Sequence, residues 1–210
     1  MTPVNIMRVR RLAMLLSDFA PHPSNSVELE QYTTDGDLAA RWLADIAAYG
    51  DLAEGCTVAD LGAGNGVLGL GALTMGAGRA MLVEADQAAC EVAKSNAESL
   101  GFADSVEVFH ATLGSDPVDL SSADVVISNP PWGRQTPRAD RPFLEAMIAA
   151  AAPAHLLHSA EATHIRPLFE DAGWSAERYG EADFALPAAY SHHSRQRGRT
   201  RAAFWRLTPP

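Results

Sequence analysis

The chain has 210 residues and a formal net charge of −10 at pH 7, and 47 % of its residues are hydrophobic and 20 % charged. These proportions are typical of a globular domain and exclude a disordered chain, because the apolar residues suffice to form a core. The longest apolar run is shorter than the roughly 18 residues of a transmembrane helix, and the apolar stretch near the N-terminus is too short for a secretory signal, so we expect a cytoplasmic protein without a membrane-bound segment.

The N-terminal part is expected to form a short unit of its own. Residues 1–30 are predicted to form a basic helix followed by a loop, and residues 31–210 to form the main domain. The first helix of that domain is predicted over residues 35–49, because apolar residues recur there at helical spacing. We expect Thr34 to be its N-cap, with Asp37 three residues later as in a capping box.

From Gly55 onward, β-prone segments alternate with helical ones. Strands are predicted over residues 56–61, 80–83, 106–109, 124–128 and 154–158, helices over 67–75, 88–100, 139–151 and 160–172, and a closing antiparallel pair over 174–179 and 201–207. This alternation indicates an α/β fold, with a seven-stranded, mostly parallel sheet covered by helices on both faces. Ligands of such sheets bind at the carboxyl ends of the strands, so we look for functional residues directly after each strand.

A glycine-rich motif follows the first predicted strand. It reads Asp60-Leu61-Gly62-Ala63-Gly64-Asn65-Gly66, and its glycines allow the backbone to approach a ligand closely. A carboxylate at Asp60 would repel a pyrophosphate, and it suits S-adenosylmethionine, which carries a sulfonium and an ammonium but no phosphate. Glu84, at the end of the second strand, is placed to accept hydrogen bonds from ribose hydroxyls, with Asp86 as the alternative. A strand–turn–helix connection without a ligand remains the structural alternative.

A second motif, Asn129-Pro130-Pro131-Trp132, follows the most apolar predicted strand. Consecutive prolines fix φ and remove backbone donors, which leaves rigid carbonyl acceptors beside the side-chain oxygen of Asn129. Two such acceptors can hold both hydrogens of an exocyclic amine, so that the lone pair of its nitrogen can attack a methyl sulfonium. The indole of Trp132 offers a face on which a nucleobase could stack, worth about 1–3 kcal/mol. The structural alternative is a proline-rich turn with a packed tryptophan.

The acidic total conceals two basic ends. Residues 1–17 contain three arginines and residues 185–210 contain five, neither segment contains an acid, and residues 18–184 therefore carry −18. These ends could contact a phosphate backbone, or they could simply be solvated. The candidate RNA-binding residues are Arg195, Arg197 and Arg199 in the C-terminal segment, together with Arg134 and Arg138, which follow Trp132.

Together these motifs resemble the class I S-adenosylmethionine-dependent methyltransferases that methylate amino groups. The segments 29–34 (LEQYTT), 60–66, 129–133 (NPPWG) and 186–190 (LPAAY) are similar in order and spacing to the methyltransferase-like protein five family. That family installs N6-methyladenosine on small-subunit ribosomal RNA. The resemblance implies a Rossmann-like class I methyltransferase fold, with Asn129, Pro130, Pro131 and Trp132 holding the target adenine. The expected S-adenosylmethionine-binding residues are Gln31, Thr34, Asp60, Gly62, Gly64, Asn65, Val67, Glu84 and Thr112.

Some positions depart from the family pattern. The family usually has Phe at the position of Trp132, and an acid near the cofactor adenine at about the position of Ala111, which leaves that contact to Thr112 or to a backbone amide. Eukaryotic members resemble partners of a small zinc-containing activator protein that adds a strand to the sheet edge. Residues 106–109 would be the matching edge here, unless the chain itself covers them.

No metal site is expected in the chain itself. Cys56 and Cys90 lack the spacing of a zinc site or a disulfide framework. His155 and His158 are three residues apart on a predicted strand, so they should face opposite sides of the sheet.

From the two motifs, the basic ends and the family resemblance, we predict an S-adenosylmethionine-dependent N6-adenine methyltransferase acting on RNA, with small-subunit ribosomal RNA as the expected substrate. The alternatives are a protein-glutamine N5 methyltransferase acting on a translation factor and a non-catalytic RNA-binding subunit.

Overall fold

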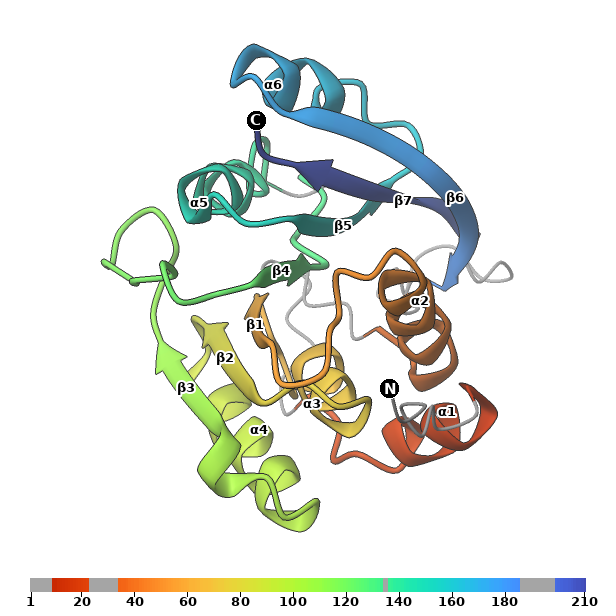
Figure 1. Ribbon diagram of the computed structural model, residues 1–210, viewed down its shortest axis with the longest axis vertical. Coiled ribbons are helices and arrows are strands. Elements are labelled where there is room, and N and C mark those ends of the chain that lie inside the picture. Colours follow the sequence, from red (N-terminus) through yellow and green to blue (C-terminus); the bar gives the residue numbers. More distant parts are fainter. Residues whose placement is uncertain (1–8, 23–33, 134–135, 186–198) are drawn as a thin grey trace, which may run out of the picture.

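The computed structural model describes residues 9–22, 34–133, 136–185 and 199–210, and Figure 1 shows a single sheet with helices packed around it. Gln31, Arg134, Arg195 and Arg197 and the segment 186–190, all singled out from the sequence, lie outside these residues. Among the described residues, no helix has the length and apolar character needed to cross a membrane.

The sheet has seven strands in the order β3-β2-β1-β4-β5-β7-β6 within the described part of the chain. The strands are β1 (Thr57–Leu61), β2 (Arg79–Glu84), β3 (Val106–His110), β4 (Val125–Ser128), β5 (Ala154–Ser159), β6 (Ser175–Ala185) and β7 (Arg199–Thr208). β1 to β5 run parallel to one another, and β7 pairs antiparallel with both β5 and β6. The predicted fold class, the closing antiparallel pair and the edge position of β3 are thereby confirmed.

Helices cover both faces of the sheet. They are α1 (Val9–Ser17), α2 (Gly36–Ala48), α3 (Val67–Thr74), α4 (Gln87–Ser99), α5 (Arg141–Ala150) and α6 (Ile165–Asp171), with a short 3₁₀ turn, η1, at Ala103–Ser105. One apolar cluster contains buried residues of α1 to α4, and a second contains buried residues of α5 and α6. Helix α1 buries Leu12 and Leu16 in the first cluster, so it packs with α2 and α3.

The start of α2 differs from the prediction. Its N-cap is Asp35, whose carboxylate accepts a hydrogen bond from the backbone amide of Leu38 at 2.8 Å. Thr34 is instead buried and turns its hydroxyl toward the end of β4. Helices α5 and α6 also begin later than predicted, and α5 has Pro142 in its first turn, where a missing N–H costs least.

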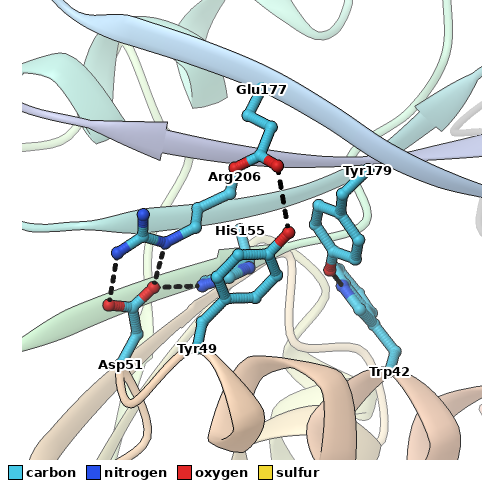
Figure 2. Close-up of polar contacts among 7 residues, drawn as sticks. All are labelled: Trp42, Tyr49, Asp51, His155, Glu177, Tyr179 and Arg206. Atoms are coloured by element: carbon cyan, nitrogen blue, oxygen red, sulfur yellow. Dashed lines mark hydrogen bonds and ion pairs between the residues drawn. The ribbon is translucent and has the colours of Figure 1, made fainter.

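A polar network fastens the end of α2 to the last strands of the sheet (Figure 2). The carboxylate of Asp51 accepts hydrogen bonds from Nε of Arg206 at 2.7 Å, from its Nη2 at 3.0 Å and from Nε2 of His155 at 2.9 Å. Along α2, the indole of Trp42 donates to the hydroxyl of Tyr179 at 3.0 Å. Burial raises the pKa of Asp51, but the hydrogen bonds from Arg206 and His155 outweigh it and hold the pKa below its usual value.

Replacement of Asp51 should loosen this network. In Asp51→Asn the guanidinium of Arg206 loses its charged partner, and we expect the free energy of unfolding to fall by about 1.5–3 kcal/mol. The pKa of Asp51 is lower in the folded protein than in the unfolded chain. The difference in unfolding free energy between wild type and Asp51→Asn should therefore be present above the unfolded-chain pKa of about 3.9 and disappear as the pH falls further. Urea denaturation measures it, with the exposed Glu161→Gln as a control expected to stay within about 0.5 kcal/mol of wild type. Equal stability of Asp51→Asn and wild type at pH 7 would contradict this role.

Candidate active site

A cavity of about 330 Å³ lies at the carboxyl ends of β1, β2 and β4. This is the end of a parallel sheet at which ligands bind, and the size is within the usual range for a small-molecule pocket. Nine of the residues singled out from the sequence line it: Thr34, Gly62, Gly64, Asn65, Val67, Glu84, Thr112, Asn129 and Pro131. Residues far apart in the chain therefore meet at one hollow.

The glycine loop is held in place by the carboxylate of Glu84. One of its oxygens accepts the amide of Gly64 at 2.8 Å, and the other accepts the amides of Ala85 and Asp86, each at 2.9 Å. Gly62 and Gly64 have φ of 73° and 54°, which glycine adopts without steric cost. Glu84 thus ties the end of β1 to the end of β2, and its carboxylate still has lone pairs for a ligand hydroxyl.

Asp60 occupies a different place from the one expected. Asp60 is 1 % exposed, and it does not line the cavity. One carboxylate oxygen accepts the amide of Gly69 at 2.9 Å, and the other has no hydrogen-bond partner within the described part of the chain. Burial raises the pKa of Asp60 to about 7. Asp60 therefore lies beneath the loop, where its charge can act on the cavity only across the backbone.

Asn129 stands at the end of β4 with its amide held on both sides. Its Nδ2 donates to the hydroxyl of Thr34 at 3.1 Å, and its Oδ1 accepts the indole N–H of Trp132 at 3.2 Å. The indole can only donate, so this contact fixes which end of the amide is the oxygen. Pro131 lines the cavity, and Pro130, which follows Asn129 directly, is buried.

Trp132 does not offer the open stacking face expected from the sequence. Trp132 is only 7 % exposed and belongs to the apolar cluster formed with α1 to α4. The indole stacks on the imidazole of His158, with ring centroids 6.0 Å apart and an interplanar angle of 27°. The aromatic residue of the motif is therefore packed into the protein beside the cavity in this conformation.

Behind the indole, two histidines converge on the buried Asp140. Its Oδ2 accepts Nε2 of His158 at 3.1 Å and Nε2 of His164 at 2.5 Å. Burial raises the pKa of Asp140, but these two hydrogen bonds outweigh it and hold the pKa below its usual value. His155, on the same strand, points instead to Asp51.

Asp140, His158 and His164 are close enough to be considered as metal ligands, since their ligand atoms all lie within 4.8 Å of one another. A metal-bound imidazole almost always donates its other N–H to an acceptor, yet Nδ1 of the buried His158 has no hydrogen-bond partner among the described residues. A hydrogen-bonded support for the indole fits this arrangement better. That the protein holds no metal stays a prediction.

Several cavity residues carry no motif and were missed. They include His22, Leu68, Ala139, Pro142 and Phe143. A Cβ on Gly62 would lie 3.0 Å from the ring of Phe143, so the first turn of α5 closes over the glycine loop. The carbonyl of Ala20 accepts the side-chain amide of Asn65 at 3.0 Å, which brings the segment after α1 to the same loop. Only the tertiary fold reveals these contacts.

The arginines proposed for RNA binding are only partly within the described residues. Arg138 is exposed in the turn before α5, with a φ of 64°, and Arg199 begins β7. The other three lie outside, so RNA binding by these arginines stays a prediction.

Comparison with known proteins gives consistent matches. Residues 37–162 match the family model of the methyltransferase small domain. The chain is 30 % identical over 208 residues to the rRNA N(6)-adenosine-methyltransferase METTL5 of Danio rerio, which covers 97 % of this chain and 100 % of that protein. It is 33 % identical over 202 residues to a protein of unassigned function from Methanocaldococcus jannaschii, covering 91 % of this chain and 90 % of that one. A Pyrococcus horikoshii crystal structure, of a protein proposed to be an RNA methyltransferase, is similar with a TM-score of 0.86 and 31 % identity, covering 97 % of this chain and 98 % of that one.

The buried carboxyl group of Asp60 should make stability depend on pH. Its folded pKa of about 7 exceeds the unfolded value of about 3.9, so between these two pH values the folded protein binds one proton more than the unfolded chain. Relative to Asp60→Asn, the wild-type free energy of unfolding should therefore rise as the pH falls from 7 to 5, by up to about 1.4 kcal/mol per pH unit. Urea unfolding of both proteins across this range measures the difference. A difference that does not change with pH would show that Asp60 stays ionised.

Proposed function

Because the chain belongs to the methyltransferase small-domain family and, over nearly its full length, to the family of METTL5, we propose that it transfers the methyl group of S-adenosylmethionine to N6 of an adenosine in RNA. Small-subunit ribosomal RNA is the substrate we propose. The observation that carries the proposal is the fixed amide of Asn129, which lines the cavity and whose oxygen accepts a hydrogen bond from the indole N–H of Trp132.

The cavity suits S-adenosylmethionine on chemical grounds. Among its described lining residues there is no Lys or Arg to neutralise a pyrophosphate, whereas Glu84 lines it and Asp60 lies beneath the loop. A ligand with a sulfonium and an ammonium gains from these carboxyl groups, and Glu84 can also accept hydrogen bonds from ribose hydroxyls. When bound, this cofactor supplies an electrophilic methyl group.

In the proposed reaction, Asn129 provides the acceptor that orients the attacking nitrogen. Its Oδ1 and the carbonyl of Pro130 bind the two hydrogens of the adenine amine, which turns the nitrogen lone pair toward the methyl carbon. The N–C bond forms as the C–S bond breaks, and the proton that the nitrogen then loses passes to solvent. The hydroxyl of Thr34 accepts a hydrogen bond from Nδ2 of Asn129 and so supports the side chain at the end of β4.

Partners and location belong to the same proposal. Arg134, Arg138, Arg195, Arg197 and Arg199 would contact the RNA backbone around the target base. The edge strand β3 would accept a strand from a small zinc-containing activator protein, because Val106 and Val108 are only partly buried at this edge. We propose that the protein works in the cytoplasm.

Asn129→Ala should abolish most of the methyl transfer. Loss of a single preorganised hydrogen-bonding group that acts on the reacting atoms typically costs about 100- to 1,000-fold in kcat, and we expect a loss of this order. Incorporation of radiolabelled methyl groups into unmodified small-subunit RNA measures it, while calorimetry checks that the variant still binds S-adenosylmethionine. Exposed Arg166→Ala is the control. Equal incorporation by Asn129→Ala and wild type would remove the mechanism, and label in a translation factor instead of RNA would favour a protein-glutamine substrate.

Glu84→Gln should weaken cofactor binding. Both oxygens of Glu84 accept backbone N–H groups, so a glutamine must turn its NH₂ toward one of these donors and disturb the loop. We expect the Kd for S-adenosylmethionine, measured by calorimetry, to rise by about tenfold or more. The control is Glu91→Gln on the exposed face of α4, which should bind like wild type. An unchanged Kd in Glu84→Gln would contradict the role of this carboxylate.

A further inference from the structure

Resting on the proposed function, we infer that Trp132 blocks the acceptor of Asn129 in the free enzyme and must release it before the target amine can bind. We further infer that His158 and Asp140 are positioning residues that set where the indole lies. In the free enzyme, the indole N–H then occupies the oxygen of Asn129 to which an N–H of the target base would bind.

The first step of the argument is competition for one oxygen. Oδ1 of Asn129 accepts the indole N–H at 3.2 Å, while Nδ2 is bound to Thr34 at 3.1 Å and offers no acceptor. A carbonyl oxygen has a second lone pair. However, a base that also stacks on the indole needs a face of that ring, and Trp132 is only 7 % exposed. The indole therefore has to turn for both contacts to form.

The second step concerns what holds the indole. The imidazole of His158 stacks on it, and the one hydrogen bond of this imidazole in the described structure runs from Nε2 to Asp140 at 3.1 Å. Asp140 lies between Ala139 and Pro142, both of which line the cavity. The support of the indole and the cavity wall thus belong to one turn, so a ligand that moves this turn also moves Trp132.

The backbone beside the indole permits a change of position. Gly133 follows Trp132 directly and has a φ of 74°, a conformation that glycine adopts without strain. A Cβ on Gly133 would lie 3.4 Å from the backbone nitrogen of Arg138, an ordinary van der Waals distance, so it is the positive φ that favours glycine here. Rotation about χ1 and χ2 of Trp132 can carry the indole away without unfolding β4, and Gly133 allows the turn that follows to adapt.

The direct test is Trp132→Phe, which keeps an aromatic face and removes the N–H. We expect the KM for RNA to fall by about two- to tenfold, because a larger fraction of the enzyme then presents a free acceptor. A raised or unchanged KM would overturn the inference.

A second readout follows the indole itself. The chain has four tryptophans, and Trp132→Phe identifies the Trp132 indole N–H signal in ¹⁵N-labelled protein by its loss. That signal should shift in Asn129→Ala, and it should shift in wild type on addition of an RNA oligonucleotide containing the target adenosine together with S-adenosylhomocysteine. A signal that neither change moves would overturn the inference.

A matched pair of histidine variants separates positioning from stability. His155 and His158 are both buried on β5, and each is bonded to an aspartate. Both His155→Gln and His158→Gln should lower stability, but only His158→Gln should move the Trp132 signal and alter the KM for RNA. Equal effects of the two variants on that signal would overturn the role of His158.

The two proposals can fail separately. If wild type methylates RNA while the Trp132 signal stays unchanged on RNA binding, this inference alone is overturned. If wild type transfers no methyl group to RNA, the proposed function is overturned, and the shift in Asn129→Ala still reports on the contact.

Discussion

The whole account depends on the orientation of one amide at the end of β4. The side chain of Asn129 is useful as an acceptor only if its oxygen, rather than its nitrogen, faces the reacting group. Thr34 has a hydroxyl that either end of the amide could satisfy, so it cannot fix the orientation alone. The indole N–H of Trp132 can only donate, and it settles the choice. This hydrogen bond orients Oδ1 of Asn129 as an acceptor and at the same time occupies it. The same contact therefore prepares the site and controls when the target amine can bind.

The fold supplies the rigidity that this amide needs. Ser128 donates its hydroxyl to the carbonyl of Leu61 at 2.7 Å, which joins the ends of β4 and β1 just before Asn129. Thr34 precedes the N-cap of α2, and the far end of that helix is held to β5 and β7 through Asp51 and Arg206. The site is therefore supported from both ends of α2 as well as from the sheet, and Figure 2 shows the contacts at the far end of the helix.

Much of this arrangement could be predicted from the sequence, because local pattern determines it. Alternating strands and helices indicated the parallel sheet, and motifs directly after the strands indicated the residues that line the cavity. The errors have tertiary causes. Thr34 matched an N-cap pattern, but its hydroxyl bonds to Asn129, and Asp35 caps the helix instead. Trp132 resembled an exposed stacking residue because the sequence does not reveal that His158, 26 positions later, packs against it.

The most direct test is a crystal structure of the protein with S-adenosylhomocysteine and an RNA that carries the modified site. The account predicts an adenine whose N6 lies about 3 Å from Oδ1 of Asn129, with the indole of Trp132 turned away from that oxygen and stacked on the base. An adenine amine bound far from Asn129, or an indole still donating to it while the base is in place, would contradict the account.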